Sequence, residues 1–480
     1  MNISIVPSTS AAERMPEACD HLVAAPTRRL TRLAKPLTLA AMSLGYVVVQ
    51  LDVTIVNVAI NSIGASFGGS LAGLQWIVNA YTVTFAAFIL TAGALGDRLG
   101  ARRIFVSGFA VFVLASLACA LAPALWVLIL ARLGQGIGAA ILVPNSLALL
   151  NHAYPNDRER HWAVGIWAAG ASFALTAGPL VGGALISLVG WRSIFIINLP
   201  IGLAGIWLTW RYADETTRAP ARTLDIAGQT VAVLALGALA AATIEGGARG
   251  FSDWLVLAGL ITFAALAALF VAIEFKSKRP MLPLALFRSR AFSATALTGL
   301  LVNVGCYGLI FVLSLYFQRL NHLSPLQTGL AFAPMMAAVL VTNLVAARVV
   351  GAIGARLTIA AGLLVTAASC VGMLWIEPGT HYAALCAQLI GLGGGLGLLV
   401  PPLTSTMLGS VAKSYSGVAS GVLNAMRQSG SVLGVALFGS LLGGSAGFVG
   451  GLRMALIIAA ALALCALVAV LIGVPRRLKA

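Results

Sequence analysis

Two ionisable residues stand inside long apolar stretches of this 480-residue chain. Asp52 lies in the run Leu-Asp-Val-Thr-Ile-Val-Asn, and Arg132 lies in the run Leu-Ile-Leu-Ala-Arg-Leu-Gly-Gln. A low-dielectric pocket disfavours the charged form of a carboxyl group, which can then load and release a proton near neutral pH. Arginine keeps its proton, so Arg132 needs a carboxylate, a polar cavity or backbone carbonyls beside it. We expect Asp52 to carry protons and Arg132 to be its partner; alternatively, each residue only holds helices together.

Other polar residues within apolar stretches are candidates to line a substrate cavity. A side chain that reaches out to lipid headgroups would explain the arginine among them equally well. Interhelical hydrogen bonding alone would explain most of the amides. The candidates are Asn57, Asn79, Gln135, Arg427 and Gln428.

Enzyme chemistry is not indicated by any motif of the chain. Residues 443–447 match the pattern G-x-S-x-G, but no strand precedes them to build a nucleophile elbow. The pattern G-x-x-x-x-G-K-[ST] of a P-loop is absent from the sequence. The six cysteines and five histidines show neither metal-ligand nor disulfide spacing. We therefore expect no catalytic residues, no cofactor and no metal.

The composition indicates an all-α, polytopic membrane protein. Hydrophobic residues make up 60% of the chain and charged residues 9%, whereas a soluble domain carries about 25% charged residues. The net charge of +16 could suggest a nucleic-acid partner. The basic residues gather in loops and tails, however, so we expect none.

Long apolar segments predict fourteen membrane-spanning helices. With an even number of spans both termini share one side, and on that side we count 24 Lys and Arg residues against 4 on the other. The positive-inside rule then makes both termini cytoplasmic. The expected spans are 37–64, 73–95, 104–121, 125–150, 162–188, 193–212, 226–243, 255–275, 293–318, 328–350, 357–376, 382–408, 417–442 and 452–474.

The order of the spans predicts two six-helix bundles with two helices inserted between them. The first bundle would cover residues 37–212 and the second residues 293–474. The inserted helices and their linkers would cover residues 213–292. Residues 1–36 and 475–480 would form cytoplasmic tails.

Two glycine-rich segments have unusual patterns. The segment from Gly93 to Arg103 reads G-A-L-G-D-R-L-G-A-R-R, and we expect a short charged loop between the second and third spans. In the fifth span, a proline flanked by small residues predicts a bend and a smooth face for a partner helix. The charged-loop residues are Gly93, Asp97, Arg98, Gly100, Arg102 and Arg103, and the expected hinge comprises Gly178, Pro179, Gly182 and Gly183.

These motifs resemble the fourteen-helix drug/proton antiporter branch of the major facilitator superfamily. Four stretches carry the resemblance in the right order: Leu51 to Ala59, Gly93 to Arg103, Arg132 to Ala140 and Gly170 to Gly183. Within that branch, the chain looks most like antibiotic exporters of the methylenomycin A resistance type. The resemblance implies an inner-membrane exporter that moves small amphipathic drugs outward against protons by alternating access. We expect the protein to be a monomer. It also implies that Asp97 docks on a helix N-terminus of the other bundle and latches the outward-open state.

The resemblance leaves other functions open. The chain could export or import a metabolite with the same fold, or act as a membrane sensor that does not transport. We expect no second carboxylate deep in a span, because Glu245, Asp253 and Glu377 lie near the outer surface. One deep carboxylate and two deep arginines favour a neutral or anionic substrate over a dication.

Overall fold

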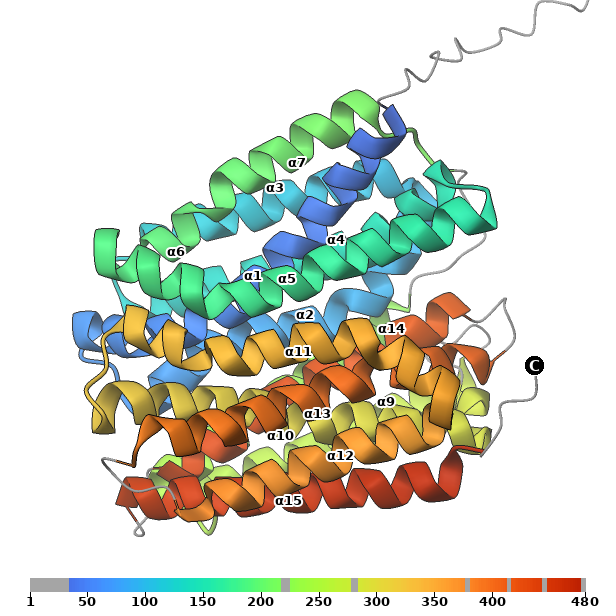
Figure 1. Ribbon diagram of the computed structural model, residues 1–480. Helices are drawn as coiled ribbons and strands as arrows, with labels where there is room; N and C mark the ends of the chain where they lie inside the picture. Colours follow the sequence, from blue (N-terminus) through green and yellow to red (C-terminus); the bar gives the residue numbers. More distant parts are fainter. Residues whose placement is uncertain are drawn as a thin grey trace, which may run out of the picture.

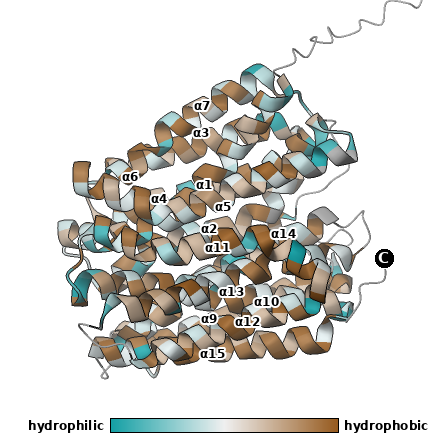
Figure 2. Ribbon diagram, viewed as in Figure 1, coloured by the Kyte–Doolittle hydropathy of each residue, from teal (hydrophilic) through white to brown (hydrophobic). Residues whose placement is uncertain are grey.

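The computed structural model describes residues 34–216, 225–277, 284–375, 380–411, 416–442 and 447–475. Helices make up nearly all of these ranges, and their ends differ from the predicted ends by at most six residues, as at Arg249 against 243. Most of the expected tails, parts of the linkers, Glu377 and most of the 443–447 loop lie outside the described residues. Hydrophobic residues cover the middles of the helices, and hydrophilic residues gather towards their ends (Figure 2).

The helices before residue 213 pack into one bundle (Figure 1). Its first helix lies against the fifth, the seventh and the fourth, while the third packs on the fourth and seventh. The sixth predicted span is divided in two by a break at Ile197. The helices are α1 (Ala34–Phe67), α2 (Leu71–Leu99), α3 (Ala101–Ala120), α4 (Leu125–Ala153), α5 (Asp157–Val189), α6 (Ser193–Ile196) and α7 (Asn198–Tyr212).

A second bundle is formed by the helices after residue 283. In Figure 1 it occupies the lower part of the view, below the first bundle. Its elements are η1 (Leu284–Arg288), α10 (Arg290–Leu315), η2 (Tyr316–Leu320), α11 (Pro325–Ile353), α12 (Ala355–Gly372), η3 (Met373–Trp375), α13 (Tyr382–Gly409), α14 (Ser416–Leu442) and α15 (Gly447–Gly473). We call the face of the molecule where α1 begins and α15 ends the terminal face, and the other the opposite face.

Of the two inserted helices, α8 (Ile226–Arg249) contacts both bundles, and α9 (Trp254–Lys276) packs on α8. Near the start of α8, the side-chain amide of Gln229 donates to the carbonyl of Ala87 on α2 at 2.9 Å. Near its end, Gly247 lies so close to Ser440 on α14 that a Cβ atom there would be 2.3 Å from the Cβ of Ser440. Helix α8 therefore crosses the seam between α2 and α14.

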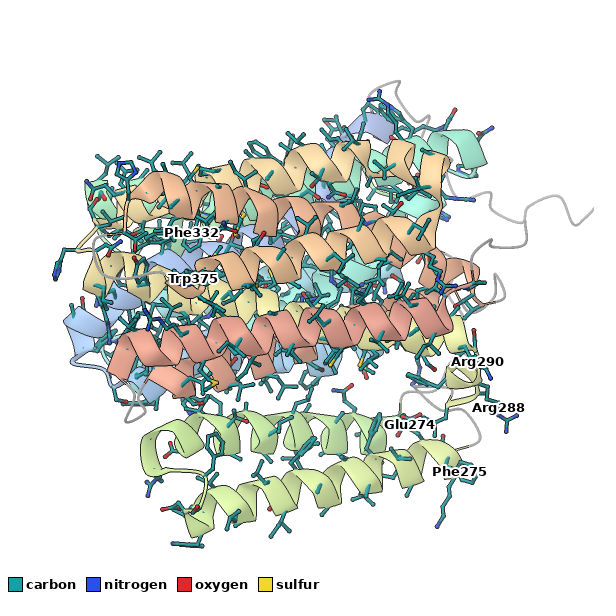
Figure 3. All side chains as sticks on the ribbon, turned by 60° about the horizontal axis from the view of Figure 1, so that its bottom comes forward. Glu274, Phe275, Arg288, Arg290, Phe332 and Trp375 are labelled. Atoms are coloured by element: carbon teal, nitrogen blue, oxygen red, sulfur yellow. The ribbon has the colours of Figure 1, made fainter. Side chains whose placement is uncertain are left out.

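Helix α9 packs on α8 and buries little of its own surface. Its buried residues are Val256 and Glu274, and Glu274 is 2% exposed. Glu274 lies against Gly228 at the start of α8, on the same end of the molecule as Arg288 and Arg290 (Figure 3). Glu274 stands in the last turn of a helix that hydropathy alone places in lipid, so it is a buried carboxylate at the end of a span rather than a second one deep within it.

Thirteen helices of the described residues are long and apolar enough to cross a membrane. The remaining predicted span, 417–442, corresponds to α14, which has 27 residues and packs between α10 and α2. It is less apolar than the others because it carries Asn424, Arg427 and Gln428 among many glycines and serines. Its polarity fits a helix that faces other helices more than lipid.

The expected loop between the second and third spans is almost entirely helical, so that prediction was wrong. Helix α2 continues through Asp97 to Leu99, and α3 begins at Ala101. Gly100 alone separates the two helices, with φ of +104°, which a residue with a Cβ rarely adopts. The glycine therefore makes the tight turn for which the sequence suggested a longer loop.

Candidate functional site

A buried ion pair lies at the centre of the first bundle. Asp52 on α1 is 0% exposed and Arg132 on α4 is 1% exposed. Nη1 of Arg132 donates a hydrogen bond to Oδ2 of Asp52, and Nε donates to the carbonyl of Ile77 at 3.1 Å. The guanidinium also lies over the ring of Tyr81, 4.4 Å from its centroid. The structure thus brings together the two residues that the sequence suggested as partners.

Amide side chains surround the second oxygen of the Asp52 carboxylate. Gln135 Nε2 donates to Asp52 Oδ1 at 2.9 Å, and Asn198 Nδ2 donates to the same atom at 3.3 Å. Both amides also donate to Ser116 Oγ, at 3.0 and 2.9 Å, and Gln135 Oε1 accepts from Arg132 at 2.7 Å. Gln135, which we expected in a substrate cavity, therefore lies in this network instead.

Asn198 and Ser116 are site residues that the sequence analysis missed. Asn198 begins α7 directly after the helix break, and Ser116 lies in α3 and donates to the carbonyl of Phe195 at 3.1 Å. A signal was present, because an asparagine near the start of an apolar span needs a polar partner. The network joins α1, α3, α4 and α7. A change of charge on Asp52 would therefore alter hydrogen bonds that involve four helices of one bundle.

Glycines of α5 bring the two bundles into backbone contact. A Cβ atom on Gly178 would lie 2.0 Å from Thr54 Oγ1, so α5 packs tightly on α1. A Cβ on Gly183 would lie 2.5 Å from the carbonyl of Pro325, and one on Gly329 of α11 would lie 2.2 Å from the carbonyl of Pro179. Of the expected hinge residues, Pro179 and Gly183 thus contact α11, whereas Gly178 and Gly182 pack on α1.

Further hydrogen bonds join the bundles towards the opposite face. Ser314 Oγ on α10 donates to the carbonyl of Asn57 at 2.7 Å, and Gln318 Nε2 donates to the carbonyl of Val58 at 3.0 Å. Gln75 Nε2 on α2 donates to two carbonyls of α14, those of Val435 at 3.1 Å and Ala436 at 2.9 Å. The structure is therefore a conformation in which the bundles meet at the opposite face.

Several of the expected cavity residues have polar atoms without a hydrogen-bond partner in the described part of the chain. Asn79 is 0% exposed, and neither its Oδ1 nor its Nδ2 is paired. Asn57 Oδ1 and Gln428 Oε1 are also buried and unpaired. Since a buried, unpaired amide costs free energy, these side chains are suited to hold a polar group of another molecule or water.

Glu215, which the sequence analysis overlooked, caps the helix after the charged turn. Its carboxylate accepts from the backbone N–H groups of Arg102 at 2.9 Å and Arg103 at 3.4 Å. A Cβ on Gly100 would lie 2.5 Å from the carboxyl carbon of Glu215, so glycine is required here for a second reason. A carboxylate at a helix N-terminus is stabilising, and this one ties the segment after α7 to the start of α3.

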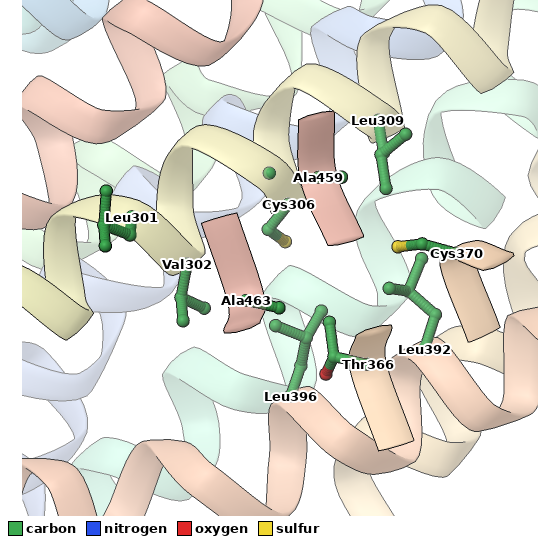
Figure 4. Close-up of a pocket in the computed structure, with 11 residues that line it drawn as sticks. Leu301, Val302, Cys306, Leu309, Thr366, Cys370, Leu392, Leu396, Ala459 and Ala463 are labelled. Atoms are coloured by element: carbon green, nitrogen blue, oxygen red, sulfur yellow. The ribbon is translucent and has the colours of Figure 1, made fainter. Parts of the chain in front are cut away.

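Outside this network, the described ranges could offer a metal site or a small pocket. No group of three or more His, Cys, Asp and Glu residues there could hold a metal ion. A small pocket inside the second bundle is lined by α10, α12, α13 and α15 and contains Cys306, Thr366 and Cys370 (Figure 4). Its walls come from one bundle, so it lies apart from the contact between bundles.

Comparisons with known proteins identify the family. The model of the Major Facilitator Superfamily matches residues 42–435. The chain is 39% identical over 409 residues to the multidrug resistance protein Stp of Mycobacterium tuberculosis, covering 85% of this chain and 75% of that protein. It is 38% identical over 404 residues to a methylenomycin A resistance protein of Streptomyces coelicolor, covering 84% and 85% of the two chains.

A solved structure with the same fold is a bacterial homologue of the human lysosomal transporter Spinster, in an inward-facing, unoccupied conformation. The TM-score is 0.67 at 17% sequence identity, and the match covers 93% of this chain and 99% of that one. Fold, family match and sequence relatives agree over most of the chain, which is therefore a multi-pass membrane protein and a member of the major facilitator superfamily.

Proposed function

We propose that the protein is a proton-coupled exporter of small amphipathic drugs or antibiotics. The observation that carries the proposal is the fully buried Asp52–Arg132 pair, held in place by Gln135 and Asn198. The relatives named for multidrug and methylenomycin A resistance support drugs as the cargo. Protons would move inward as the drug moves outward.

Proton coupling follows from the pairing of Asp52 and Arg132. When Asp52 takes up a proton, its charge disappears and Arg132 becomes a buried cation without a counter-ion. An unpaired buried charge is strongly unfavourable, so the helices α1 and α4 favour a different arrangement in which Arg132 finds another partner. A proton on Asp52 and a drug in the central region would then stabilise different conformations, which makes the exchange obligatory.

Alternating access would use the contact surfaces between the bundles. We place the terminal face in the cytoplasm, because Arg98, Arg102 and Arg103 lie there at the turn between α2 and α3. With the bundles joined at the opposite face, the structure then corresponds to an inward-facing state. The segment around Pro179 acts as the hinge on which α11 moves, and the protein works as a monomer in the inner membrane.

Flux measurements on the purified protein in liposomes test the proposal. With an acidic lumen and inside-out orientation, methylenomycin A and a panel of fluorescent drugs should accumulate inside, and a protonophore should abolish the accumulation. Drug uptake at the same rate with and without the pH gradient would contradict proton coupling. Substrate binding without any flux would support a membrane sensor, and flux of a common metabolite alone would support a metabolite transporter.

Replacing Asp97 with asparagine is expected to slow transport without changing the range of substrates. Asp97 is half-buried near the end of α2, and we propose that it docks on a helix N-terminus of the other bundle in the outward-open state. Loss of the negative charge weakens an interaction with a helix dipole by about 0.3–1 kcal/mol, which corresponds to a fewfold lower turnover rate. Initial rates for three unrelated substrates would be compared, and a selective loss of one substrate would contradict the role.

A further inference from the structure

Three aromatic side chains meet where the two bundles touch. The rings of Tyr46 on α1 and Trp167 on α5 are stacked, with centroids 4.2 Å apart and planes inclined by 19°. Trp167 Nε1 donates to Ser146 Oγ at 3.1 Å, which fixes the indole ring. Trp167 belongs to the buried apolar core of the first bundle, against which Tyr46 packs. Tyr307 of α10 and Ala425 of α14 pack against this core from the second bundle. The aromatic group therefore belongs to both bundles.

Arg427 of α14 adds a positive charge to this group. Its Cγ lies 3.7 Å from the position that a Cβ on Gly299 would take, so the side chain starts against α10. Its positive charge interacts electrostatically with Tyr46 and Tyr307. Arg427 thus lies at the contact between bundles, rather than reaching out to lipid headgroups.

The two arginines within the apolar core differ in their charge balance. Arg132 is compensated by the carboxylate of Asp52. Arg427 is half-buried and takes part in no ion pair or hydrogen bond that the described residues show. A cation at membrane depth requires a partner, and no carboxylate of the described residues supplies one to Arg427.

We propose that Tyr46, Trp167, Tyr307 and Arg427 form a subsite for a planar aromatic compound that carries a carboxylate or an ionised phenol. The inference rests on the proposed export function, since it assigns a substrate class to the same central region. Aromatic rings stack with one another at 4.5–7 Å between centroids, so a planar ligand would extend the stack of Tyr46 and Trp167. The planar guanidinium would bind the anionic group through two hydrogen bonds.

The same arrangement selects against other drugs. A cationic compound would be repelled by Arg427, and a neutral one would bury the guanidinium without compensating its charge. Tyr46 and Trp167 belong to the first bundle, whereas Tyr307 and Arg427 belong to the second. The affinity of a ligand that bridges them would therefore depend on the relative position of the bundles. The substrate of an alternating-access transporter requires such a dependence.

Binding of two matched probes to the purified full-length protein tests this subsite. Anthracene-9-carboxylate and anthracene-9-carboxamide share their ring system and differ in charge. Titrations in lipid nanodiscs at neutral pH should show the carboxylate binding about tenfold more tightly or better, as expected for a charge-assisted hydrogen-bonded pair. Equal affinities in the unmodified protein would overturn the proposal.

Two substitutions each remove one positive charge, one at the proposed subsite and one at a control position. Arg427→Gln should abolish the preference for the carboxylate, whereas Arg348→Gln on the exposed side of α11 should preserve it. Arg427→Lys keeps the charge and should retain part of the preference, which provides a test if the glutamine variant does not fold. Trp167→Leu should weaken the binding of both probes. The assignment would be overturned if a folded Arg427→Gln variant kept the ratio of carboxylate to carboxamide affinity unchanged. It would also be overturned if Arg348→Gln abolished the preference for the carboxylate.

Binding without a gradient separates this inference from the proposed function. If the unmodified protein binds the carboxylate preferentially but moves no compound in the liposome assay, the subsite stands and the exporter proposal fails. If it exports other drugs under a pH gradient and binds both probes equally, the exporter proposal stands and the subsite fails.

Discussion

Asp52→Asn is expected to reduce proton-driven accumulation of substrate to background while the protein still binds its substrate. Asparagine cannot release a proton, and its NH₂ group would face donors, because Arg132, Gln135 and Asn198 all donate to the Asp52 carboxylate. Accumulation in liposomes with an imposed pH gradient, measured beside equilibrium binding, checks this result. Drug accumulation in the variant at the rate of the unmodified protein would contradict the role of Asp52 as proton carrier.

The loss of proton coupling in this variant must be distinguished from a loss of folding. Removing one partner of a buried ion pair costs about 3–5 kcal/mol because the other charge stays buried. The double variant Asp52→Asn, Arg132→Gln removes both charges and should be more stable than the single variant, yet equally unable to couple transport to protons. Thermal unfolding of the two proteins, followed by the same flux assay, separates stability from coupling.

Gly329→Val is expected to prevent full closure of the opposite face and to lower turnover at least about tenfold. A Cβ atom at residue 329 would lie 2.2 Å from the carbonyl oxygen of Pro179, far inside van der Waals contact. Helix α11 must therefore move away from α5, which destabilises the closed arrangement; each 1.4 kcal/mol changes the population ratio tenfold. Spin labels at residues 188 and 330, which are exposed on α5 and α11, would report a longer distance.

Gly351→Val is the matched control for that substitution. It lies on the same helix, and a Cβ atom at residue 351 would meet nothing within 4 Å. Both variants carry the same cost of valine in a helix, so only the contact with α5 distinguishes them. Equal transport rates in the two variants would show that the close approach of α5 and α11 is not needed for the cycle.

Hydropathy and charge patterns predicted the spanning helices well, because each helix satisfies its own backbone hydrogen bonds and needs only sufficient apolar length. The pairing of Asp52 with Arg132 was predictable for a similar reason, since two opposite charges at membrane depth need each other. Span prediction gives no rotation of a helix about its axis, however. It could not decide whether Gln135 faces Asp52 or the central region, nor whether Arg427 faces lipid.

The residues that were missed act through tertiary contacts between distant segments. Glu215 caps α3 from a position 113 residues after Arg102, so no local pattern around either residue reveals the contact. Glu274 was overlooked because it ends a helix that is otherwise lipid-facing and is buried only through the approach of α8. Asn198 depends on the break at Ile197, which a hydropathy window averages away.

The oblique course of α8 makes the two sides of the transporter unequal towards the bilayer. On one side, α8 covers the contact between α2 and α14, and α9 covers α8 towards the lipid. Helices α5 and α11 instead form the front of the molecule in Figure 1, and the structure shows no further helix over them in this view. Lipid therefore borders the contact between the bundles directly at α5 and α11, whereas α8 and α9 separate it from the contact between α2 and α14.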